Sequence, residues 1–138
     1  MAQITAYLTF NGNCREAMTF YQECLGGELV FQTVGSSPMA DQMPPQMKGS
    51  ILHSSLHHGA LVIMASDMCS DKGLIKGTNV TLCINSTSEE EARNFYALLS
   101  AGGDATHPMQ PTFWGALFGD LTDQFGTQWM INFETNQQ

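Results

Sequence analysis

"EAMTFYQECLGG" (residues 16–27) and "EARNFYALLSAGG" (residues 91–103) are two versions of one phrase in a chain of 138 residues. They share Glu-Ala, Phe-Tyr and Gly-Gly, and Glu91 follows Glu16 at about half the length of the chain. Two unrelated amphipathic helices can share such a stripe by chance, but both phrases here also follow a strand-like run. The sequence therefore predicts an internal duplication.

Each phrase has the pattern of a capped amphipathic helix. The apolar positions of the first copy recur at i, i+3, i+4, i+7 and i+8, as Ala17, Phe20, Tyr21, Cys24 and Leu25. Asn13 with Glu16 forms a capping-box pattern at its start, and Gly26 is a typical helix stop. In the second copy Ser88 and Glu91 form the same box, and a Gly-Gly pair follows the helix.

Short runs rich in β-branched and aromatic residues flank both helices. One run precedes each helix, at residues 4–10 and 78–85. Three runs follow the first helix, at residues 28–34, 50–58 and 60–66. Three follow the second, at residues 104–110, around 113–119 and at 128–134, and prolines confine the first of these to an edge or a bulge.

This order predicts an α+β fold in which a β-α-β-β-β module occurs twice. We expect a single domain, residues 1–138, with modules at about 1–67 and 78–138 and a linker at 68–77. Residues 36–48 form a polar loop with three methionines and three prolines. This loop is either a flap over a site or a tolerated surface insertion.

Composition narrows the classes of function. The chain carries 5 basic and 13 acidic residues, a formal charge of -8, without any Lys or Arg cluster for nucleic acid or anionic lipid. The N-terminal sequence lacks the basic and apolar regions of a signal peptide, so we expect a cytoplasmic protein. The four cysteines form no C-x-x-C pair, so we interpret them as buried or half-buried thiols.

Four stretches together carry a family resemblance: "YLTFNGNCREAMTFYQECLGGEL", "ILHSSL", "LVIMASD" and "FWGALFGDLTDQFGTQWMIN". They run from Tyr7 to Asn132 and resemble the PhnB-like branch of the vicinal oxygen chelate superfamily. That superfamily contains glyoxalase I, extradiol dioxygenases, and fosfomycin and bleomycin resistance proteins. The resemblance implies that each module curls into a half-barrel, that two modules enclose a cavity, and that the protein is a homodimer.

The catalytic members of the superfamily hold a divalent metal at four strand positions, usually with His, Glu or Gln. The resemblance places these positions near Ala6, Thr81 (or Asn79), Met64 and Met130. A shift of register brings in Tyr7, Val80, Ile63 and Ile131. A thioether is a poor ligand for a hard cation, so we expect no cofactor, and a divalent metal only with non-standard ligands.

Histidines are the candidate chemical groups. His53 occupies the histidine position of the PhnB-like pattern, in a strand expected to line the cavity, and could be a base, a hydrogen-bonding group, a lone metal ligand or a purely structural residue. His57 and His58 resemble exposed residues of a hairpin turn, and His107 is expected to face solvent. Asp67 and Asp123 precede turns and are expected to hold them.

An apolar pocket follows from the aromatic and methionine residues of the two modules. The residues expected to bind a ligand are His53, Met64, Phe113, Trp114, Trp129 and Met130. The first hypothesis is a homodimeric, metal-free protein that binds a small organic molecule. The second is a glyoxalase- or dioxygenase-like enzyme with His53 as base or metal ligand. The third is a filled pocket, with a function of the dimer surface alone.

Overall fold

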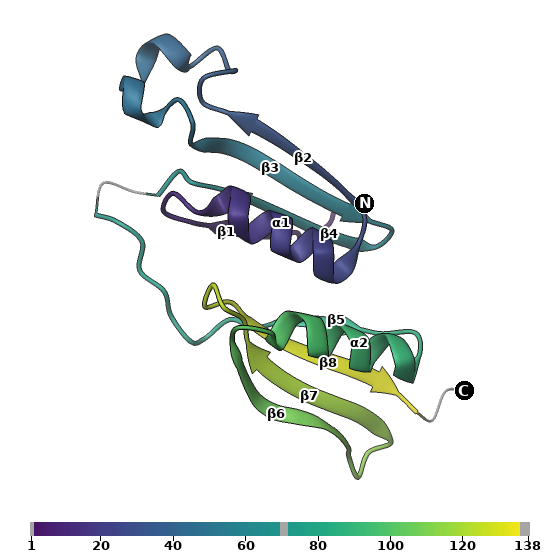
Figure 1. Cartoon of the computed structure of the whole chain (residues 1–138). Helices are drawn as coiled ribbons and strands as arrows, with labels where there is room; N and C mark the ends of the chain where they lie inside the picture. Colours follow the sequence, from purple (N-terminus) through teal and green to yellow (C-terminus); the bar gives the residue numbers. More distant parts are fainter. Residues whose placement is uncertain (1, 70–71, 136–138) are drawn as a thin grey trace. The chain divides into compact units, whose positions relative to one another are not determined.

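The computed structural model describes residues 2–69 and 72–135 and divides into two compact units, Met1–Ile75 and Lys76–Gln138 (Figure 1). The linker expected at 68–77 includes residues 70–71, which lie outside the described residues. The expected single domain and the cavity between modules stay predictions.

Unit 1 contains one helix and one four-stranded sheet. Its elements are β1 (Ala6–Thr9), α1 (Cys14–Leu25), β2 (Glu28–Thr33), β3 (Ile51–His58) and β4 (Leu61–Ser66). The sheet order is β1-β4-β3-β2, with β1 parallel to β4 and the other pairs antiparallel. Two short 3-10 helices, η1 (Ala40–Gln42) and η2 (Pro45–Met47), lie in the loop between β2 and β3.

Unit 2 repeats this topology. Its elements are β5 (Leu82–Asn85), α2 (Glu89–Ser100), β6 (Asp104–Pro111), β7 (Ala116–Thr122) and β8 (Gln128–Glu134), in the sheet order β5-β8-β7-β6. The predicted α+β fold with two β-α-β-β-β modules is confirmed. The Pro-bearing strand β6 lies at the sheet edge and its register shifts twice, as its prolines indicated. β7 begins later than expected, because residues 113–115 form the turn before it.

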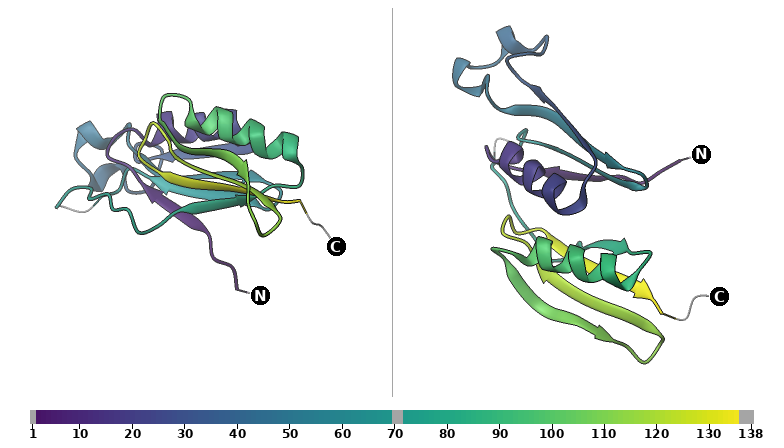
Figure 2. Two further views of the ribbon diagram at one scale, coloured as in Figure 1. Left: turned by 90° about the horizontal axis from the view of Figure 1, so that it is seen from below. Right: turned by 45° about the vertical axis from the view of Figure 1, so that its right-hand side comes forward.

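Each helix covers one face of its own sheet, the helix face, and the opposite face is called the open face (Figures 1 and 2). The helix face holds the buried side chains, because strand residues alternate between faces. In unit 1 these include Leu56, Ile63 and Ala65, and in unit 2 Trp129 and Ile131, all at most 6 % exposed. The candidate site therefore lies on the open faces.

The start of α1 differs from its expected capping. Asn13 occupies the N-cap position, but its side chain makes no capping hydrogen bond. Asp67, which follows β4, supplies the acceptor: its Oδ1 accepts from the backbone N–H groups of Gly12 at 2.9 Å and Cys14 at 3.0 Å. Its Oδ2 accepts from the N–H of Ile51 at 2.9 Å. The expectation that Asp67 holds a turn is met, and it also links three segments of unit 1.

The expected caps are present at the start of α2 and the end of α1. Ser88 Oγ accepts a hydrogen bond from the N–H of Glu91 at 3.1 Å, while the Glu91 carboxylate accepts from the N–H of Thr87 at 2.9 Å. Gly26 ends α1 with φ +79°, a left-handed conformation that favours glycine. The repeated phrase therefore encodes similar helices but begins them by different means.

Asp123 holds the turn between β7 and β8. Its Oδ1 accepts from the N–H groups of Phe125 at 2.8 Å and Thr127 at 3.1 Å, and its Oδ2 accepts from Trp129 Nε1 at 2.8 Å. Asp123 is 3 % exposed. The carboxylate thus fixes both the turn and the indole ring that packs under α2, in agreement with its expected role.

The four cysteines differ in their exposure to solvent. Cys14 and Cys24 are buried, Cys69 is half-buried and Cys83 is exposed, so the expectation for the thiols is wrong only for Cys83. Within residues 2–69 and 72–135, no helix has both the length and the apolar content required to cross a bilayer.

Alkaline solution is expected to destabilise unit 1 through Cys14. The pKa of this thiol is raised from 9.0 to about 11, mainly by burial and also by the nearby Asp67 carboxylate, against the opposing hydrogen bond to Ser54. The unfolded chain loses this proton first, so the stabilisation is complete below pH 9 and falls between pH 9 and 11, by roughly 2 kcal/mol. Urea unfolding at several alkaline pH values measures this loss. Cys14→Ala should flatten the decline, and an unchanged decline would contradict the assignment.

Candidate functional site: the open faces of the two sheets

One row of side chains crosses the open face of unit 1. Strand pairing aligns Tyr7 with Met64, Met64 with Ser55, and Ser55 with Val30. Tyr7 is 51 % exposed and Val30 is 55 % exposed, although both are large and partly apolar. This row is a continuous surface of aromatic, thioether and aliphatic groups with one hydroxyl from Ser55.

The functional group at this surface is the pair formed by Tyr7 and His53. Tyr7 Oη lies 3.2 Å from His53 Nδ1, and the two ring centroids are 5.8 Å apart. Because the phenol can donate its proton to Nδ1, the imidazole can keep its other nitrogen, Nε2, for a bound molecule. His53 therefore lies on the open face, two residues along β3 from Ser55, the pairing partner of Met64, and its expected place in a cavity stays a prediction.

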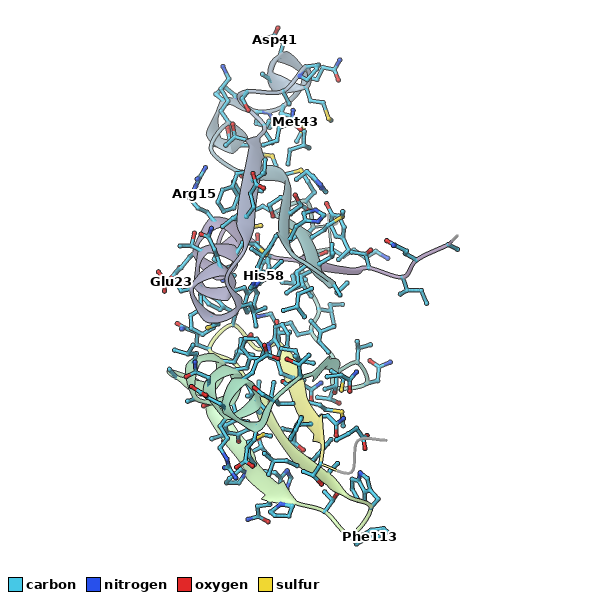
Figure 3. The ribbon with its side chains drawn as sticks, turned by 90° about the vertical axis from the view of Figure 1, so that its right-hand side faces the viewer. Arg15, Glu23, Asp41, Met43, His58 and Phe113 are labelled. Carbon is cyan, nitrogen blue, oxygen red and sulfur yellow. The ribbon has the colours of Figure 1, made fainter. Side chains whose placement is uncertain are left out.

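The neighbouring histidines of β3 have separate positions. His57 and His58 lie at the end of the strand itself, and the turn after them contains Gly59. His58 Nδ1 lies 2.7 Å from the carbonyl oxygen of Leu25, at the C-terminal end of α1 (Figure 3). The expectation that His57 and His58 belong to the turn is corrected: they are exposed strand residues, and His58 donates to a helix carbonyl.

The open face of unit 2 carries the corresponding row with different chemistry. Cys83 of β5 pairs with Met130 of β8, Met130 with Asp120 of β7, and Asp120 with His107 of β6. His107 Nδ1 lies 2.9 Å from Asp120 Oδ1. His107 faces solvent as expected, but its carboxylate partner was not anticipated. Although Cys83 is exposed, partial desolvation raises the pKa of its thiol, which favours the neutral form.

A hollow of about 200 Å³ opens beside this row. Its lining residues are Thr81, Thr106, Asp120, Leu121, Thr122, Gln128, Trp129 and Met130. Leu121 and Trp129 are each 2 % exposed and belong to the core, whereas strand pairing and alternation place Asp120, Thr122, Gln128 and Met130 on the open face. The hollow is therefore mostly polar, with Met130 as its apolar residue.

The aromatic residues of unit 2 do not form one pocket wall. Phe113 and Trp114 lie in the turn between β6 and β7, 97 % and 55 % exposed, with rings in an edge-to-face contact at 4.9 Å (Figure 3). Trp129 lies next to Met130 in β8, so the two side chains point to opposite faces. Trp129 was predicted to bind a ligand together with Met130, and this is corrected here because its side chain is buried on the helix face and its Nε1 donates to Asp123 Oδ2.

The corner positions of the expected metal site do not carry its usual donors. On the open faces the first and last strands present Tyr7 with Met64, and Cys83 with Met130. Within either unit, as far as the structure describes it, no three His, Cys, Asp or Glu side chains group in a way that could hold a metal ion. The phenol, thiol and thioethers at these positions differ from the His, Glu or Gln donors of the catalytic superfamily members.

Sequence reasoning missed Cys83, Asp120 and their alignment with Met130. The expected first-strand position of module 2 was Thr81, two residues before Cys83 on the same face. Strand alternation from Met130 along β8 indicates which of its neighbours share the open face. It does not give the register with β7, so Asp120 could not be located.

The sequence profile of the family described as "3-demethylubiquinone-9 3-methyltransferase" matches residues 2–132. The chain belongs to this family. A solved structure described as "Putative 3-demethylubiquinone-9 3-methyltransferase, PhnB protein", from Bacillus cereus, matches with a TM-score of 0.72 at 21% identity, covering 96% of this chain and 99% of that one. The PhnB-like resemblance is thereby confirmed.

Two closer relatives match almost end to end. Protein YjdN of Escherichia coli is 35% identical, over 97% of this chain and 97% of its own. Protein PA1353 of Pseudomonas aeruginosa has a solved structure with a TM-score of 0.83 at 41% identity, over 97% of this chain and 98% of its own. More distant structures of this fold are described as glyoxalase-related or as glyoxalase/bleomycin resistance/dioxygenase proteins. The chain therefore belongs to this PhnB-like family and has the superfamily's fold.

Proposed function

We propose that this family member is a cytoplasmic, homodimeric protein that binds a small organic molecule on the open face of its sheets, without a metal. The observation that carries the proposal is the Tyr7–His53 pair, whose atoms lie 3.2 Å apart on an exposed, partly apolar surface. Such a surface with few polar groups is typical of ligand sites, where apolar area supplies affinity and hydrogen bonds supply orientation.

The side chains around His53 indicate the form of the ligand. Met64 offers a flexible, polarisable contact, Val30 an aliphatic one and Tyr7 the face of a ring. His53 provides one hydrogen-bonding nitrogen beside them. A molecule with a flat or aliphatic body and one polar group matches this arrangement, and no Lys or Arg lies in the row to favour a phosphonate.

Dimer formation is supported by the sheet edges. In unit 1 the edge strands are β1 and β2, and in unit 2 they are β5 and β6. Tyr7 and Val30, on the two edge strands of unit 1, expose more than half of their surface. Unpaired edges next to exposed apolar side chains favour pairing with another chain. A second copy of the chain would cover the sheet edges and the exposed apolar side chains.

Tyr7, Met64, Cys83 and Met130 stand where the catalytic superfamily members usually carry His, Glu or Gln ligands. This difference supports the metal-free part of the proposal. Elemental analysis of untagged protein, followed by titration with nickel, zinc, manganese and iron, tests it. Tight stoichiometric binding that disappears in His53→Ala would replace it with the enzyme hypothesis. The hollow in unit 2 is small for a whole nucleoside-bearing methyl donor, and we derive no methyl-transfer step from the family's description.

A screen of small molecules for an increase in melting temperature tests ligand binding, because selective binding to the folded state stabilises it. For a ligand found in this way, His53→Gln is expected to weaken binding about 5- to 30-fold, since one buried hydrogen bond is worth about 1 to 2 kcal/mol. Tyr7→Phe should have a smaller effect in the same direction. Calorimetric titration measures both.

His57→Gln is the matched control, because His57 lies on the same strand but makes no hydrogen bond to Tyr7. Affinity unchanged in His57→Gln and reduced in His53→Gln supports the site. Equal affinity in all variants places the ligand elsewhere and contradicts the proposal. A screen without any stabilising molecule would favour a protein that acts through its dimer surface alone.

A further inference from the structure

The hollow on the open face of unit 2 has a charge pattern of its own. Among its lining residues one is ionisable as a carboxylate, Asp120, and none is Lys or Arg. Three threonines, Thr81, Thr106 and Thr122, and Gln128 add hydroxyl and amide groups around it. An anion would meet the carboxylate with no compensating positive charge, so the hollow selects against anions.

Asp120 is held in place but keeps an unused acceptor. Its side chain is 32 % exposed, and Oδ1 is occupied by His107 Nδ1 at 2.9 Å. Within the described residues, Oδ2 has no hydrogen-bond partner. The Tyr96 hydroxyl donates to the backbone carbonyls of both Asp120 and His107 at 3.0 Å, which fixes the two strands against each other. The carboxylate is therefore preorganised toward the hollow by contacts on both faces of the sheet.

We propose that this hollow binds the ammonium group of a small organic cation. An ammonium group has three N–H donors, which match one carboxylate oxygen and two threonine hydroxyl oxygens. The volume of about 200 Å³ is below that of a site for a whole drug-sized molecule, so the hollow takes a head group while the rest of the ligand lies outside. Met130 at its edge contacts the first carbons.

This inference rests on the proposed function, because it names the chemical class of one part of the ligand. It adds a site in unit 2, with residues that the Tyr7–His53 pair does not include. The two proposals therefore have separate readouts, at His53 in unit 1 and at Asp120 in unit 2.

Amide NMR titrations of the full-length protein with isobutylammonium, isobutanol and isobutyrate test the assignment at constant ionic strength. The three probes share a branched carbon skeleton and differ in charge. Isobutylammonium is expected to shift the resonances of Asp120 and Thr122 with saturation, and to bind at least fivefold more tightly than either other probe. Equal shifts from all three probes would overturn the proposal.

Three variants locate the interaction. Asp120→Asn removes the charge and should weaken isobutylammonium binding at least fivefold. Glu90→Gln makes the same charge change on the exposed first turn of α2, on the helix face, and should leave binding within twofold. His107→Gln keeps an N–H group for Asp120 Oδ1, so binding should be retained.

If Asp120→Asn and Glu90→Gln weaken isobutylammonium binding equally, the effect comes from the net charge of the protein. This result would overturn the proposed site. The proposal would also be overturned if His107→Gln loses binding while Asp120→Asn retains it, since the imidazole would then be the binding group. If the probe binds through Asp120 while His53 variants leave every ligand unaffected, only the site in unit 1 is refuted.

Discussion

Asp67→Ala should destabilise unit 1 by about 3 to 5 kcal/mol, a large part of the stability of a small folded unit. Asp67 is 7 % exposed, and its carboxylate accepts three backbone N–H groups, those of Gly12, Cys14 and Ile51, at 2.9 to 3.0 Å. Alanine leaves all three donors without this acceptor. Urea unfolding, with hydrogen exchange of the Cys14 and Ile51 amides, measures the loss and locates it.

Asp67→Asn separates geometry from charge. The amide keeps one oxygen but must turn an NH₂ group toward at least one backbone N–H, so about half of the alanine effect is expected. Asp41→Asn is the control, because Asp41 lies exposed in the loop between β2 and β3 (Figure 3). If Asp67→Asn is as stable as Asp41→Asn, the carboxylate is not the link between the loop before α1, the first residue of α1 and the start of β3.

The element order could be predicted from sequence because each signal is local. The stripe of Ala17, Phe20 and Tyr21 marks a helix, and alternating or β-branched runs mark strands, whatever the rest of the chain does. The cap of α1 could not be predicted in the same way. Its acceptor, Asp67, lies 53 residues from Cys14, and nothing in the local pattern around Asn13 indicates that its side chain makes no capping bond.

For the candidate site, the sequence predicted which strand a residue belongs to, but not how neighbouring strands align. Sequence correctly assigned Met64 and Met130 to the last strand of each module, and these residues do lie on the open faces. It did not anticipate that Met130 aligns with Asp120, because register depends on turn lengths and on the bulges of β6. It grouped Trp129 with Met130 by composition, although adjacent strand residues point to opposite faces.

The two units use the same topology but fix their last strands with different aspartates. In unit 1 the carboxylate of Asp67 lies after β4 and reaches the start of α1. In unit 2 the carboxylate of Asp123 lies before β8 and reaches Trp129 at 2.8 Å. The turn between β7 and β8, residues 123–127, is longer than the corresponding turn of unit 1, residues 59–60, and it contains both Asp123 and a left-handed Gly126 at φ +89°. Duplication has therefore kept the strand order without keeping the polar contacts that stabilise it.

Asp123→Ala is accordingly expected to destabilise unit 2 by about 3 to 4 kcal/mol, because the N–H groups of Phe125 and Thr127 and the indole N–H of Trp129 all lose a buried charged acceptor. Trp129 also reports the change directly. In a Trp114→Phe background its emission is that of a buried indole, and Asp123→Ala should shift it to longer wavelength before global unfolding. Asp104→Ala, at the exposed start of β6, is the control for loss of an aspartate in the same unit. An unshifted emission maximum, together with unchanged urea unfolding, would mean that packing under α2 holds the indole without its carboxylate partner.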